Sequence, residues 1–221
     1  MKENYTHISV ILDRSGSMES IRDDVIGGFN AFLDEQQALE GSATLTLVQF
    51  DSQNPYEVLA NFQLIGTVQP LSRELFVPRA STPLLDAMGR GINDLEATLA
   101  KMKEGERPAK VIFLIVTDGQ ENSSREFSRK QITEMIAKHE KEHAWQFVYI
   151  SADLSAIGEA RDLGMQADKV MAFDKNGAGT RNAMMSFSKQ AAAYRSNPAA
   201  APLAFDEEDR AHQDAEKNRK K

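Results

Sequence analysis

The segment Asp13-Arg14-Ser15-Gly16-Ser17 places a carboxylate and two hydroxyl side chains at every second position. Alternate side chains of an extended loop emerge on the same side, so Asp13, Ser15 and Ser17 can converge on one point. Three oxygen donors that converge in this way suit a small, hard cation such as Mg²⁺. The residues alone also allow a second interpretation, a strand-to-helix loop in which Ser17 caps the next helix.

Two further oxygen-bearing side chains occupy comparable loops later in the chain. Thr82 comes just before a proline and a run with helical spacing, and Asp118 closes the most apolar run of the sequence. Each has a purely structural interpretation. Thr82 could be a helix N-cap ahead of Pro83, and Asp118-Gly119 could form an ordinary turn.

Strand-like and helix-like segments alternate along the chain and would carry these loops. Apolar or alternating runs predict strands at Ile8–Leu12, Ala43–Phe50, Tyr56–Gln63, Val111–Val116, Trp145–Ile150 and Lys169–Phe173. Helical spacing predicts helices over 19–38, over Leu84–Met102, near 126–142, over Leu154–Leu163, and through Met184 to Tyr194. This order predicts a Rossmann-like, doubly wound α/β fold, with a mostly parallel six-stranded sheet, one antiparallel edge strand and helices on both faces.

In open α/β sheets, ligands bind beyond the carboxyl ends of the parallel strands. That rule gathers the five donors at one edge of the sheet, an arrangement that helix capping alone does not explain. The sequence therefore predicts a metal site formed by Asp13, Ser15, Ser17, Thr82 and Asp118. The predicted ion is Mg²⁺, with Mn²⁺ or Ca²⁺ as alternatives.

Together these segments resemble the von Willebrand factor A domains and their metal-ion-dependent adhesion site (MIDAS), an Asp-x-Ser-x-Ser motif with a distant Thr and a distant Asp. The match is to Asp13-Arg14-Ser15-Gly16-Ser17, to Ser81-Thr82-Pro83-Leu84 and to Thr117-Asp118-Gly119. The order of elements is similar over roughly residues 5–195, and the likeness is to compact, single-domain bacterial and phage members.

The resemblance implies a protein-binding module without catalysis of its own. Ser15, Ser17 and either Thr82 or Asp118 would contact magnesium directly, and Asp13 would hold it through water. An acidic side chain of a protein partner would complete the coordination. The resemblance also implies an AAA+ ATPase or an assembly complex as the wider partner. The alternative is a structural or assembly protein that keeps the metal only for stability.

Two arginines flank these motifs. Arg14 and Arg79 could reinforce the contact with an anionic partner, or they could be solvated surface residues.

Size and composition limit the number of domains, the type of metal site and the class of partner. A chain of 221 residues fits one domain, predicted over 1–196, followed by a polar tail at 197–221 that is flexible or helical. There is no cysteine, which excludes thiolate metal sites and disulfides. A net charge of −7 without a basic stripe argues against a nucleic-acid partner. No apolar signal core or membrane-length run is present, so we predict a cytoplasmic protein without a membrane partner.

Two enzyme hypotheses compete with the binding module. His139-Glu140-Lys141-Glu142-His143 matches the zinc-protease pattern, with Glu159 as a candidate third ligand. The pattern lies among charged residues at the end of a predicted helix, which is typical of a solvated face. Asp13 could instead accept a phosphoryl group, but Ser15 stands where such enzymes resemble one another in having a second carboxylate.

Overall fold

A computed structural model of the chain describes residues 1–152, 156–173, 177–197 and 201–209. Its strands are β1 (Lys2–Asp13), β2 (Ser42–Phe50), β3 (Glu57–Leu64), β4 (Pro108–Thr117), β5 (Gln146–Ser151) and β6 (Val170–Ala172). Its α-helices are α1 (Arg22–Ala38), α2 (Leu84–Lys101), α3 (Arg129–His143), α4 (Ala156–Asp162) and α5 (Gly177–Ser196). Short 3₁₀ turns are η1 (Gly16–Ile21), η2 (Ile65–Thr67), η3 (Glu104–Glu106) and η4 (Ala167–Lys169).

The six strands form one sheet in the order β3-β2-β1-β4-β5-β6. All neighbouring pairs are parallel except β2 with the edge strand β3, which is antiparallel. The predicted doubly wound sheet is therefore confirmed, including its antiparallel edge. Strand order reverses between β1 and β4, so the carboxyl ends of these two strands flank the place where this kind of sheet binds ligands.

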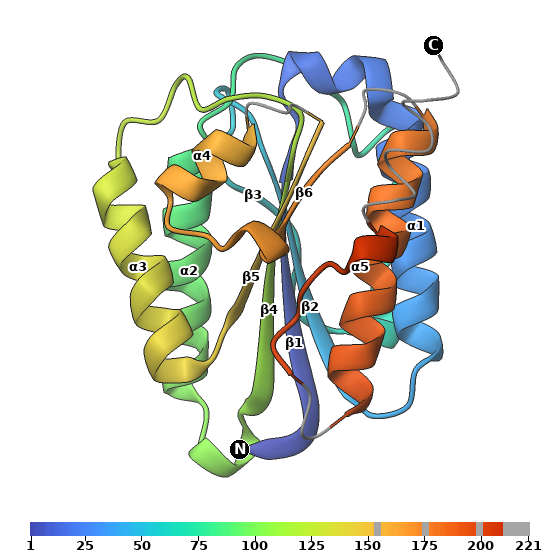
Figure 1. Cartoon of the computed structure of the whole chain (residues 1–221), viewed down its shortest axis with the longest axis vertical. Helices are drawn as coiled ribbons and strands as arrows, with labels where there is room; N and C mark the ends of the chain where they lie inside the picture. The colour runs from blue at the N-terminus through green and yellow to red at the C-terminus, as the bar shows by residue number, and fades with distance from the viewer. Residues whose placement is uncertain (153–155, 174–176, 198–200, 210–221) are drawn as a thin grey trace.

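Helices cover both faces of the sheet, α1 and α5 on one and α2, α3 and α4 on the other (Figure 1). Alternation along β1 explains the two layers. Val10 and Leu12 pack toward α1 and α5, whereas Ile11 packs toward α2. The β4 run from Val111 to Val116 is buried throughout, as expected for a central parallel strand.

Several element ends differ from the sequence prediction. β1 begins at Lys2, ahead of the apolar run, because its first residues pair with neighbouring strands. The helix predicted over 19–38 splits into the 3₁₀ turn η1 and α1. Leu154, the predicted start of the fourth helix, lies outside the described residues.

Past α5, the chain packs back onto the domain in the described range 201–209. Leu203 and Phe205 are buried in the core on the α1 and α5 side, and the Phe205 N–H donates to the Asp168 carbonyl at 2.7 Å. Residues 210–221 lie outside the described residues, so the predicted boundary at 196 and the polar tail stay predictions. None of the helices in the described ranges has both the length and the apolar character needed to cross a bilayer.

Candidate metal centre

Two buried carboxylates lie at the carboxyl edge of the sheet, at the reversal of strand order. Asp13 is the last residue of β1, and Asp118 directly follows Thr117, the last residue of β4. Both side chains are fully buried. The Thr117 hydroxyl donates to Asp13 Oδ2 at 2.6 Å, which links the ends of the two strands.

The hydroxyls of Ser15 and Ser17 join these carboxylates. The Ser15 N–H donates to Asp13 Oδ1 at 2.6 Å, and Ser15 Oγ lies 3.2 Å from Ser17 Oγ. Ser17 Oγ then donates to Asp118 Oδ1 at 2.6 Å. Ser17 lies inside η1, and α1 has Ile21 at its N-cap with no side-chain cap, so the capping interpretation of Ser17 is wrong.

Thr82 reaches the same space from a third loop. A methyl group built on Gly119 would lie 3.7 Å from both Ser17 Oγ and Thr82 Oγ1, so these two hydroxyls border one small volume. Thr82 is buried, and the N-cap position of α2 is Pro83, again with no side-chain cap. The N-cap interpretation of Thr82 is therefore wrong as well.

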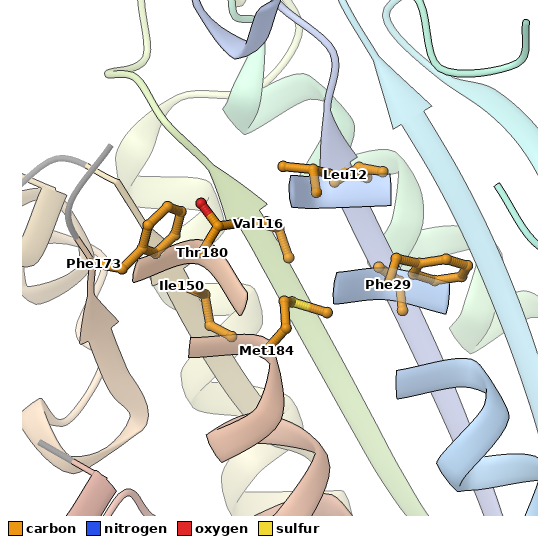
Figure 2. Close-up of a pocket in the computed structure, with 9 residues that line it drawn as sticks. Leu12, Phe29, Val116, Ile150, Phe173, Thr180 and Met184 are labelled. Atoms are coloured by element: carbon orange, nitrogen blue, oxygen red, sulfur yellow. The ribbon is translucent and has the colours of Figure 1, made fainter. Parts of the chain in front are cut away.

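The electrostatics of the cluster favour a bound cation. Burial raises the pKa of Asp13 to about 7, and the nearby charge of Asp118 adds to this rise, although hydrogen bonds from Thr117 and Ser15 oppose it. Leu12, which precedes Asp13, lines an apolar pocket together with Val116, Phe29 and Met184 (Figure 2). A positive ion beside these two carboxylates would remove the cost of their proximity.

The donor set fits a hard divalent cation. All the converging side chains offer oxygen, two as carboxylates and three as hydroxyls, the donors that Mg²⁺, Mn²⁺ and Ca²⁺ accept. Within the described part of the chain, no group of three or more His, Cys, Asp or Glu side chains could hold a metal.

Comparison with known proteins places the fold. No protein-family model and no curated protein sequence matches this sequence. Solved structures do match. A von Willebrand factor type A protein from Catenulispora acidiphila has a TM-score of 0.56 at 13% identity, over 86% of this chain and 43% of that one. Proximal thread matrix protein 1 of the mussel byssus, with a zinc-occupied MIDAS motif, has a TM-score of 0.56 at 15% identity, over 85% and 46%. Manganese-loaded TRAP protein of Plasmodium vivax has a TM-score of 0.56 at 14% identity, over 85% and 74%.

The chain has the von Willebrand factor A fold. At these identities the likeness establishes the fold alone, and the zinc and manganese are properties of the other proteins. The chain also spans less than half the length of the mussel and Catenulispora chains, at 46% and 43%.

An arginine inside the first motif of this chain has a role that the sequence did not reveal. The Arg14 side chain is only 4% exposed, and its Nη2 and Nη1 lie 2.6 Å from Asp51 and Glu57 carboxylate oxygens, respectively. Arg79 Nε also bonds Asp51, at 3.0 Å, with 41% of its side chain exposed. Arg14 is thus neither a solvated residue nor free to meet a partner.

The loop after β4 is fastened to the start of α2 by contacts that sequence reasoning missed. Glu121 accepts from the Leu85 N–H at 2.9 Å, and Asp86 accepts from the N–H groups of residues 125, 126 and 127. The ring of Phe127 covers Gly89 so closely that a methyl there would lie 2.5 Å from it. The polar run that follows Asp118 was the only available signal, and it predicts no more than a loop.

The two histidines of the zinc-protease pattern lie near each other, with 5.4 Å between ring centroids, but both also pack against Trp145 and the candidate third ligand is engaged elsewhere. His139 is buried and stacks on Trp145 at 4.1 Å between ring centroids, whereas His143 is exposed. Glu159, the candidate third ligand, instead accepts from the Glu121 N–H and pairs with Arg129 at 3.3 Å. This arrangement gives the zinc-protease hypothesis no support.

Proposed function

We propose that the carboxyl edge of the sheet binds a divalent cation, Mg²⁺, and through it an acidic side chain of a partner protein. The observation that carries the proposal is the chain of contacts from Asp13 through Ser15 and Ser17 to Asp118. These contacts join residues more than 100 positions apart at the edge where such sheets bind ligands. Thr82 borders the same space.

The five side chains would contribute to cation binding in different ways. Ser15, Ser17 and either Thr82 or Asp118 would contact the ion, and Asp13 would hold it through water. When bound, the ion supplies a positive centre that accepts a further oxygen ligand. The two carboxylates balance the charge of a divalent ion, and the three hydroxyls are neutral, so an anionic ligand from outside is not repelled.

The surface beside the site suits a protein ligand. Ser17 is exposed at the edge, and the Arg79 side chain, 41% exposed, lies next to the loop because the Ala80 carbonyl accepts from the Gly16 N–H. Two large apolar side chains, Leu75 and Val77, are 46% and 41% exposed just before Arg79 in the sequence. Exposed apolar residues beside a polar anchor are typical of protein-binding surfaces.

The test measures metal and partner together. Isothermal titration with MgCl₂ and MnCl₂ should detect one ion per chain in the wild type and none in Asp13→Ala or Asp118→Asn. Pull-downs from the native host with Mg²⁺ should recover a partner that chelator releases and that Asp13→Ala fails to capture. Partner retention in chelator would contradict metal-mediated recognition. A lower melting temperature in chelator with an unchanged complex would instead support the structural alternative.

A further inference from the structure

The start of α2 is capped by another loop and not by its own residues. A helix begins with N–H groups that lack partners inside the helix, and a threonine just before it normally supplies one. Here the Thr82 N–H donates to Asn122 Oδ1 at 2.9 Å, and the Leu85 N–H donates to Glu121 at 2.9 Å. The Asp86 N–H donates to Ser124 Oγ at 3.1 Å. The loop after β4 therefore does the capping.

Because the loop after β4 caps α2, the Thr82 hydroxyl is not needed as a helix cap and can serve as a metal ligand. The pairing of Thr82 with Asn122 is reciprocal, because the Asn122 N–H also donates to the Thr82 carbonyl, at 3.2 Å. Residue 122 lies four positions after Asp118, so the same loop fixes one carboxylate and one hydroxyl of the candidate site. With its backbone held on both sides, Thr82 presents Oγ1 toward the space beside Gly119 and Ser17.

We propose that Asn122 is a positioning residue of the metal site, acting through the backbone of Thr82. The inference rests on the proposed function, and it assigns to an exposed asparagine outside the metal motif a share of the affinity for the ion. Outer residues that orient metal ligands typically contribute 10- to 100-fold to affinity. Asn122→Ala removes the bond from the Thr82 N–H to the side chain but keeps the bond from the Asn122 N–H to the Thr82 carbonyl. We therefore expect a loss of ion affinity near the lower end of that range, about tenfold.

The experiment is a double-mutant cycle read by Mn²⁺ titration. Asn122→Ala should weaken Mn²⁺ binding about tenfold, whereas the control Asn93→Ala, at an exposed position on α2, should not. In a Thr82→Ala background, Asn122→Ala should cause no further loss, because the hydroxyl that Asn122 positions is gone. Asn122→Asp retains the acceptor oxygen and should bind Mn²⁺ at least as tightly as the wild type.

A second measurement needs no metal. In the metal-free protein, hydrogen exchange of the Thr82 amide should be faster in Asn122→Ala than in the wild type or in Asn93→Ala. Unchanged Mn²⁺ affinity in Asn122→Ala, or the same loss with and without Thr82, would overturn the inference while leaving the proposed function standing. A wild type that binds no divalent ion would overturn both.

Discussion

Replacing Arg14 by methionine should destabilise the domain by about 2–3 kcal/mol at neutral pH. Arg14 Nε and Nη2 donate to Asp51 Oδ2 at 3.0 and 2.6 Å, and the Asp51 side chain is completely buried. Breaking a buried ion pair by removing one partner typically costs about 3–5 kcal/mol, because it leaves an uncompensated charge. We take a smaller figure because Asp51 would keep Arg79 and the backbone N–H groups of Gln53 and Asn54.

The assay is urea unfolding followed by circular dichroism. With a slope of about 2 kcal/mol/M, the expected loss lowers the midpoint by about 1–1.5 M. Arg79→Met is the matched control, since that side chain is 41% exposed and makes one bond to Asp51. It should cost less than about 1 kcal/mol. Adding Asp51→Asn to Arg14→Met should recover part of the loss, because the buried charge is removed.

Equal midpoints for Arg14→Met and Arg79→Met would refute this reasoning, and Arg14 would then act as a solvated surface residue. The pH dependence gives an independent check. Burial alone would raise the pKa of Asp51, but the N–H groups of Asn54 and Gln53 and both arginines outweigh it and hold that pKa below the ordinary value. The stabilisation is therefore present above the unfolded-state pKa and is lost as pH falls through the folded one. Arg14→Met should flatten this acid limb.

Two further predictions concern residues away from the candidate site. Gly89→Ala would place a methyl 2.5 Å from the Phe127 ring, so it should cost about 1–3 kcal/mol in urea unfolding, and less in a Phe127→Leu background. Burial lowers the pKa of His7 from 6.5 to about 3, so the folded state binds fewer protons than the unfolded chain between these values. Stability should fall by roughly 4 kcal/mol as pH drops from 6.5 to 3, and His7→Gln should lose that slope.

The sequence predicted the strands and the buried helix faces, because these depend on local patterns of apolar residues. Apolar runs identified all six strands, and helical spacing identified the faces of α1 and α2, because burial imposes a fixed period on each kind of element. It could not predict the environment of Arg14. Its partner Asp51 lies 37 residues away, and the two meet only because β1 and β2 pair in register, with Asp13 opposite Phe50.

Loop contacts escaped prediction for a related reason. Glu121 and Asn122 look like ordinary polar loop residues, and their role depends on where α2 begins in space. His139 is an error of the opposite kind. The local sequence pattern suggests zinc binding, but in the folded protein the imidazole packs in the interior. Trp145 follows the pattern by two residues and stacks on the imidazole, so an aromatic residue there was a usable signal.

The strongest support for the candidate site is that, among the described helices, none is capped by the Ser17 or Thr82 hydroxyl. α3 shows what local capping looks like in this protein, since Ser128 accepts from the Gln131 N–H while the Gln131 side chain accepts in return. Ser17 and Thr82 make no such contact, because Ile21 precedes α1 and the loop at 121–124 caps α2. These hydroxyls cannot be explained by the helices that follow them. The Ser17 and Thr82 hydroxyls border the space beside Gly119, as the proposed metal site requires.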